Sequence, residues 1–147
     1  MSRADELGRL EQEVGVLIRR VKRVIGERAR AVHPDLQPAS YLMLMYLAEE
    51  GALRSSVLSD RFNVDKGAIS RQVQHLVDLG LLDREPDPDD GRAMLISASP
   101  DAVRRLRGVD RDRRDWLEGQ LSEWSETDLH DFVAGLSRYN RALDINA

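Results

Sequence analysis

Residues 83–97 read DREPDPDDGRAMLIS, a stretch dense in the carboxylates that bind hard cations such as Ca²⁺. A helix–loop–helix calcium loop needs oxygen ligands at its first, third and fifth positions, glycine at the sixth and glutamate at the twelfth. Counting from Asp87 puts Gly91 at the fifth position instead of the sixth. Counting from Glu85 puts Asp90 where the glycine must be. Neither register fits, so the stretch does not predict a calcium site.

The same stretch carries a turn signal. Asp90-Gly91 is a pair typical of tight β-turns, because glycine adopts the positive φ that such turns require. Apolar residues lie on both sides of the pair, at positions 81–82 and 94–96. We therefore predict a β-hairpin that carries Arg92 at the base of its tip.

A second group of polar side chains lies upstream, on one face of a predicted helix. That helix begins after Asp65, a suitable N-cap residue, and ends at Gly80. Its apolar residues recur at helical spacing and form one stripe: Ile69, Val73, Leu76 and Val77. The opposite, solvent-facing side carries small or polar residues: Lys66, Gly67, Ser70, Arg71 and Gln74. Such residues suit a helix that enters the major groove of DNA, but an ordinary amphipathic surface helix has the same spacing.

Three helices are predicted before this one. Apolar residues recur at alternating spacings of three and four from Leu7 to Val24, which predicts a long helix with a heptad seam for a partner helix. Pro34 ends that helix, since the residue before a proline avoids the α region. A second helix is predicted from near Pro38 to Gly51, because proline suits a first turn and glycine suits the position after a helix.

The third predicted helix is short. It covers residues 55–62, with Ser55 or Ser56 as its N-cap. Asn63 follows it as a residue that tolerates the left-handed region needed at a turn. Two long helices follow the predicted hairpin, and their N-caps are expected at Ser99 and Ser125.

Two short helices joined by a tight turn, the second with a polar N-terminal face, form a helix-turn-helix pattern. The hairpin directly behind it makes a winged helix, so the predicted fold is mainly α, an α+β winged helix flanked by N- and C-terminal helices. Arg92 on the wing suits a narrow minor groove, whose negative potential attracts a guanidinium. The alternative is a surface arginine paired with Asp89 or Asp90, a contact worth at most about 1 kcal/mol. Both interpretations can hold at once.

Residues 53–99 resemble the MarR (multiple antibiotic resistance regulator) family of winged-helix transcription factors. The most specific segments are DKGAISRQVQHL, the exit GLLDR into the wing, and DPDDGRA, in which Asp90-Gly91-Arg92 looks like the family's D-x-R wing motif. The resemblance covers the chain end to end. It implies a single MarR-like chain over 1–147, with a DNA-binding lobe at 36–99 and helical dimerisation regions at 4–32 and 100–145.

The resemblance also implies roles for single residues. Ser70, Arg71 and the helix start at Lys66 and Gly67 would face the major groove, while Arg92 would enter the minor groove and be oriented by Asp90. The chain departs from the family's pattern at two places, Gly91 and Ala98-Ser99, where many relatives have a basic residue and a Leu-Thr pair. Between positions 54 and 97, six basic residues face eight acidic ones, a net charge of −2. We therefore expect weak non-specific DNA affinity, which depends on phosphate neutralisation.

The family's assembly and regulation are implied in the same way. A homodimer built from the first and the last two helices would bind double-stranded DNA at a pseudo-palindromic operator, in most relatives as a repressor. The alternative is an intramolecular helical bundle, which would keep the chain monomeric. Most relatives are released from DNA by a small, often aromatic or phenolic, molecule. Candidates to line its pocket here are Tyr41, Met45, Tyr46 and Trp116, for which ordinary core packing is the alternative.

Composition argues against several other classes. The 147 residues include no cysteine, which excludes a disulfide framework, a thiolate metal site and a cysteine redox sensor within this sequence. The three histidines are scattered, so neither a metal nor another cofactor is expected. No apolar run approaches the roughly 20 residues of a membrane span. The first residues lack the apolar region of a signal peptide. A cytoplasmic location and no membrane partner are therefore expected.

An enzyme is not expected either. The sequence has no phosphate-binding glycine loop, no nucleophile elbow and no zinc-protease helix. Asp87, Asp89 and Asp90 are expected to be solvated on an exposed turn, where carboxylates have little reason to gain a catalytic pKa. A further alternative is a winged-helix module for protein–protein contact, whose acidic wing would dock on a basic partner.

Overall fold

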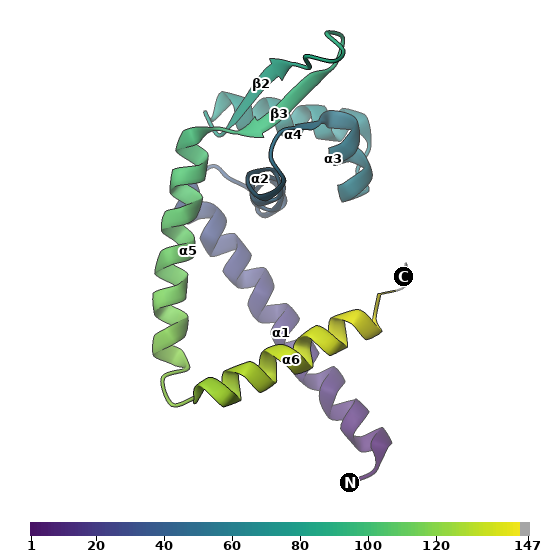
Figure 1. Cartoon of the computed structure of the whole chain (residues 1–147), viewed down its shortest axis with the longest axis vertical. Helices are drawn as coiled ribbons and strands as arrows, with labels where there is room; N and C mark the ends of the chain where they lie inside the picture. Colours follow the sequence, from purple (N-terminus) through teal and green to yellow (C-terminus); the bar gives the residue numbers. More distant parts are fainter. Residues whose placement is uncertain (145–147) are drawn as a thin grey trace. The chain divides into compact units, whose positions relative to one another are not determined.

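A computed structural model describes residues 1–144 of the chain (Figure 1). Its elements follow in the order α1 (Arg3–Val32), α2 (Pro38–Glu50), β1 (Leu53–Arg54), α3 (Ser55–Phe62), α4 (Lys66–Asp78), β2 (Leu82–Pro86), β3 (Met94–Ala98), α5 (Pro100–Gln120) and α6 (Glu126–Ala142). The mainly helical winged helix expected from the sequence is confirmed. The described residues form two compact units, one from Met1 to Val109 and one that begins at Asp110.

α1 is the long helix that the heptad spacing predicts. Ser2 caps its start, because its hydroxyl accepts a hydrogen bond from the Asp5 backbone N–H while the Asp5 carboxylate accepts one from the Ser2 N–H. The helix ends at His33, whose extended backbone precedes Pro34. Most of the seam is exposed in the single chain, including Leu7, Leu10, Leu17 and Val21.

The core of the first unit joins the end of α1, the helix-turn-helix, the sheet and the start of α5. α2 supplies much of it through buried Tyr41, Met43, Leu44 and Leu47. The other elements add Ala29, Val32, Leu36, Leu58, Ile69, Val73, Leu76, Leu81, Leu82, Ile96, Ala102 and Leu106. Full burial stabilises the fold by about 1.5–3 kcal/mol for each large aliphatic side chain. This shared core holds α4 and the hairpin on one support.

α3, a tight turn and α4 form the predicted helix-turn-helix. Asn63 has φ 50° and ψ 46°, the left-handed conformation that was expected of it. The Ser59 hydroxyl donates to the Val64 carbonyl at 2.5 Å and closes the turn. The predicted N-cap of α3 is wrong: Arg54 holds that position without a side-chain cap, because β1 runs directly into the helix and Ser55 already lies in its first turn.

The three strands form an antiparallel sheet in the order β1-β3-β2. In the predicted β2–β3 hairpin, Leu82 lies opposite Ala98 and Pro86 lies opposite Met94. β1 adds only two residues to the other edge of β3. The loop end of the hairpin extends beyond the helices of its unit (Figure 1). Seven residues, 87–93, connect its strands, so the connection is longer than a two-residue turn.

Ser99 joins the hairpin to α5 as the sequence predicts. Its hydroxyl accepts from the Ala102 N–H at 3.1 Å, which caps the helix, and donates to the Gly80 carbonyl at 2.8 Å. The Ser99 N–H donates to the Leu81 carbonyl at 2.9 Å. The end of the hairpin is thereby tied to the end of α4.

The second unit contains the last part of α5, a turn and α6. Ser125 and Asp128 form the predicted capping box at the start of α6. The Trp124 ring meets the Phe132 ring edge to face, with centroids 5.7 Å apart. None of the residues of α6 is buried, and four apolar residues at helical spacing are exposed: Leu129, Phe132, Val133 and Leu136. None of the helices within residues 1–144 combines the length and apolar character that crossing a membrane would require.

Candidate nucleic-acid interface

The polar face of α4 is the first part of the candidate interface. Asp65 caps the helix by accepting a hydrogen bond from the Ala68 N–H at 2.8 Å. Buried Ile69, Val73 and Leu76 fix which side of α4 faces the core. The predicted residues of the other side are all exposed: Lys66, Gly67, Ser70, Arg71 and Gln74. A convex helix face with two cations near its N-terminal end can enter a groove and reach phosphates or base edges.

Gly67 leaves one position in the first turn of that α4 face without a side chain. A Cβ at this position would lie 3.2 Å from the Asp65 Oδ1 that caps α4 and 3.5 Å from the Arg71 Nη1. A larger residue would therefore press against the cap oxygen of Asp65, while its contact with Arg71 would be an ordinary van der Waals one. The absence of a side chain lets a ligand approach the first turn closely.

Gln74 is tied to its neighbours in the free chain. The Arg84 Nη2 donates to the Gln74 Oε1 at 2.9 Å, and the Gln74 Nε2 donates to the Asp78 Oδ1 at 2.8 Å. Arg84 comes from β2, so this contact joins the polar face of α4 to the first strand of the hairpin. The sequence patterns do not single out Arg84. Strand alternation was the signal for it, since residues two apart share a face and Leu82 faces the core.

Asp87 corrects the expectation that all the wing carboxylates are solvated. Its side chain is 7% exposed and accepts from the Arg54 Nε at 2.7 Å and from the Arg54 Nη2 at 2.5 Å. The Asp89 N–H also donates to it, at 2.9 Å. The Asp89 bond first, and then Arg54, hold the pKa of Asp87 below its ordinary value. Asp87 is thus a fixed anion inside the wing.

Asp90 and Arg92 form the outer part of the wing. The Asp90 Oδ1 accepts from the Arg92 backbone N–H at 3.1 Å, and the Ala93 N–H donates to the Asp90 carbonyl at 3.0 Å. The turn at Asp90-Gly91 therefore exists, but Gly91 does not have the positive φ that we expected of it; within residues 1–144 only Gly51 and Gly80 are such glycines. Asp90 holds the backbone of Arg92 and not its guanidinium.

The Arg92 side chain is exposed, and within the described part of the chain no ion pair holds its guanidinium. The alternative interpretation, a pairing of Arg92 with Asp89 or Asp90, is therefore not among the contacts described. An arginine held only through its backbone can extend from the wing toward a nucleic acid.

The four candidate pocket residues have different surroundings. Tyr41 is part of the core, and Met45 and Tyr46 pack against that core. The Tyr46 ring meets the Phe62 ring edge to face, with centroids 5.4 Å apart. Trp116 belongs to the second unit and is 61% exposed. The first three thus have the core packing that was the alternative for them.

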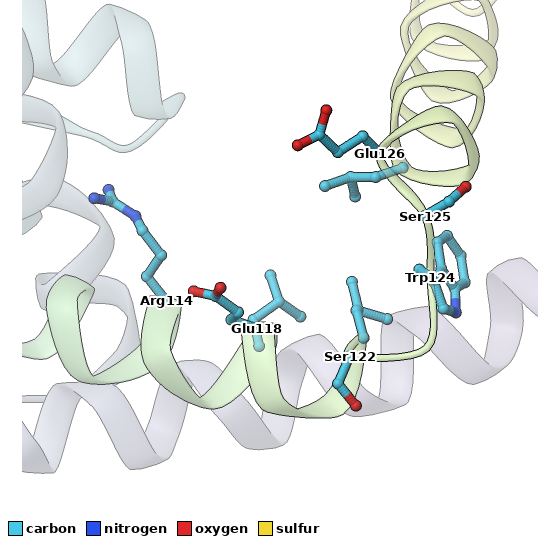
Figure 2. A pocket seen from close by; sticks show the side chains of 9 residues that line it. Arg114, Glu118, Ser122, Trp124, Ser125 and Glu126 are labelled. Atoms are coloured by element: carbon cyan, nitrogen blue, oxygen red, sulfur yellow. The ribbon is translucent and has the colours of Figure 1, made fainter.

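A groove of about 360 Å³ lies in the second unit, where α5 turns into α6. Arg114 and Glu118 project toward it from α5, and Glu126 projects from the start of α6 (Figure 2). Its apolar lining consists of Leu117, Leu121, Trp124 and Leu129. None of the four candidate pocket residues lines this groove.

The chain is similar in sequence and in fold to known proteins. Residues 35–93 match the model of the MarR family. The HTH-type transcriptional regulator YxaD of Bacillus subtilis is 32% identical over 133 residues, which cover 90% of this chain and 92% of YxaD. The HTH-type transcriptional regulator ML2140 of Mycobacterium leprae is 31% identical over 117 residues, 80% of each chain. The crystal structure of RV1404 from Mycobacterium tuberculosis has the same fold, with a TM-score of 0.81 at 20% identity over 98% of this chain and 96% of that one.

Proposed function

The chain belongs to the MarR family of winged helix-turn-helix transcriptional regulators, and on this premise we propose that it is a homodimeric repressor of a pseudo-palindromic DNA operator. Double-stranded DNA and a second copy of the chain are its partners in this proposal, and the cytoplasm is where it acts. No catalytic role is proposed, because the relatives are transcriptional regulators.

One observation carries the DNA-binding proposal. The exposed face of α4 and the backbone-held Arg92 belong to the same unit and rest on the same core. Lys66, Ser70 and Arg71 are proposed to contact the major groove, and Gly67 lets the helix approach. Arg92 is proposed to enter the minor groove, with Asp90 fixing its backbone. Gln74 stays in the proposed set, but a base contact would require it to exchange its Arg84 and Asp78 partners.

The exposed apolar surfaces support the homodimer. A monomer would leave the α1 seam of the first unit in water, and it would leave the α6 stripe of the second unit in water. Apolar helix faces exposed in this way are typical of subunit interfaces. A two-fold dimer would present two copies of α4 to half-sites whose centres lie about 10 bp apart. The operator would then mirror the symmetry of the protein.

Release by a small aromatic or phenolic effector is a finer part of the proposal. Among the four candidates, Met45 and Tyr46 in the first unit and Trp116 in the second are not fully buried, so each of them is accessible to a ligand without opening the core. Such a molecule would act by favouring a state in which the two copies of α4 are spaced differently. Titrating phenol into the protein–DNA complex tests this part, and the expected result is dissociation from DNA without any loss of protein stability.

Fluorescence anisotropy with duplexes from the DNA upstream of its own gene tests the DNA-binding proposal. Arg71→Ala and Arg92→Ala should each weaken specific binding by about 1–3 kcal/mol, while binding to a scrambled duplex stays weak. Arg138→Ala on α6 is a matched control that also removes one exposed cation. Undiminished specific binding in both interface variants would contradict these residue assignments.

A further inference from the structure

The Arg54–Asp87 pair connects β1 to the wing loop, residues 87–93. Arg54 lies next to β3 in the sheet, opposite Leu95, so its backbone is held independently of the loop. Its guanidinium contacts one Asp87 oxygen through two nitrogens, Nε and Nη2. The two residues are 33 positions apart in the sequence. This side-chain contact is therefore a long-range tether between the loop and the sheet.

Asp87 organises the loop with its remaining polar atoms. Its other carboxylate oxygen accepts from the Asp89 N–H at 2.9 Å, and its carbonyl accepts from the Asp90 N–H at 3.2 Å. Its own N–H donates to the Ala93 carbonyl at 2.9 Å, which closes the base of the loop. Asp90 then accepts from the backbone of Arg92. One series of contacts thus runs from Arg54 to the backbone of Arg92.

We propose that Arg54 is a positioning residue that acts through Asp87 to fix the wing loop in the conformation that presents Arg92 to the minor groove. This inference rests on the proposed DNA-binding function. A loop that is ordered before binding loses less conformational entropy on binding, so the tether raises affinity without touching the DNA. Without Arg54, the Asp87 carboxylate would lose its charged partner and the loop its tether.

The proposal is tested by whether removing one negative charge from the loop strengthens or weakens DNA binding. Asp87→Asn and Asp89→Asn each remove one negative charge from the same loop, and by phosphate electrostatics alone both should bind DNA more tightly. Asp89 is exposed and its carboxylate makes none of the contacts just described. We expect Asp87→Asn to weaken operator binding by about five- to tenfold and Asp89→Asn to leave it equal or slightly tighter. Equal gains in both variants would overturn the proposal.

A double-mutant cycle separates positioning from direct DNA contact. If Arg54 acts through Arg92, Arg54→Gln should weaken binding in the native protein but add little to Arg92→Ala. Fully additive losses would mean that Arg54 contacts phosphate itself, which overturns the positioning role. The neutral pair Arg54→Gln with Asp87→Asn should bind better than Arg54→Gln alone, because no unpaired carboxylate is left in the loop.

Amide hydrogen exchange of the free protein, measured without DNA, shows whether the tether orders the loop. In Arg54→Gln, exchange at the Asp89, Asp90 and Ala93 amides should rise several-fold, while the amides of α4 keep their native protection. Unchanged exchange in the loop overturns the tether. If instead the loop loosens but the native protein has no preference for any operator duplex, the proposed function fails and the tether stands.

Discussion

Three aspartates in one short loop have three different environments. Asp87 is buried and paired with Arg54, Asp89 is exposed, and Asp90 caps the backbone of Arg92. Their residue type and spacing are nearly the same, so the differences come from where the loop places each carboxylate. The contacts of Asp87, first with the Asp89 N–H and then with Arg54, hold its pKa below its ordinary value.

The lowered pKa of Asp87 predicts how its contribution to stability depends on pH. A carboxylate with a depressed folded-state pKa stabilises the fold fully above its ordinary pKa of about 3.9. That stabilisation is lost as the pH falls through the lower, folded-state value. The difference in unfolding free energy between the native protein and Asp87→Asn should therefore be constant from pH 7 to about pH 5 and shrink below about pH 4.

Urea titrations followed by far-ultraviolet circular dichroism measure this difference. Both tryptophans, Trp116 and Trp124, lie in the second unit, so their fluorescence is a poor reporter of the unit that holds Asp87. Asp89→Asn is the control with the same change of charge. If the native protein and Asp87→Asn have the same unfolding free energy throughout the range from pH 7 to pH 5, the Arg54–Asp87 pair does not stabilise the folded chain.

At the scale of elements, α4 depends on its cap as well as on its buried stripe. Asp65→Ala removes the bond from the Ala68 N–H, and we expect it to lower the unfolding free energy by about 1 kcal/mol. Asp60→Ala on α3 makes the same change in charge at an exposed site without that cap. Thermal unfolding of the two variants checks this, and equal melting temperatures would count against the cap.

The elements also show what a sequence pattern can predict. Helical apolar spacing, proline and capping residues predict α1, α2, α4 and α6, and Asn63 predicts the left-handed turn, because all of these signals are local. The missed N-cap of α3 is local too, but β1 runs directly into that helix and displaces the cap to Arg54. The Arg54–Asp87 contact joins residues 33 positions apart, so no spacing rule finds it. Strand alternation places Arg84 on the same face of β2 as Leu82, but it does not identify Gln74 on α4 as its partner.

At the scale of the whole molecule, the apolar stripe of α6 predicts the oligomeric state. Phe132 is 54% exposed in the single chain, and burying it in a subunit interface would remove its apolar surface from water. Phe132→Asp with Leu136→Asp should therefore convert a dimer into a monomer in sedimentation equilibrium. Arg138→Glu, on the opposite side of α6, is the control and should stay dimeric. A native protein that is monomeric at micromolar concentration would contradict the dimer.

The same variant predicts a loss of operator binding. A dimer holds two half-sites at once, so its second contact is effectively intramolecular and the overall affinity exceeds that of one half-site by about 10²-fold or more. The monomeric variant should keep its winged-helix fold in circular dichroism and yet bind the full operator only as weakly as a half-site. Unchanged affinity would show that one copy is sufficient.

Hydroxyl-radical footprinting of the DNA upstream of the protein's own gene resolves where each part of the proposed interface lies on the duplex. We expect two protected half-sites with centres about 10 bp apart, each flanked by a protected stretch of minor groove. In Arg92→Ala the flanking protections should disappear while the protection at the half-sites persists at higher protein concentration. No protection at any concentration would contradict the proposed operator binding. Flanking protections that survive in Arg92→Ala would contradict the proposed minor-groove role of Arg92.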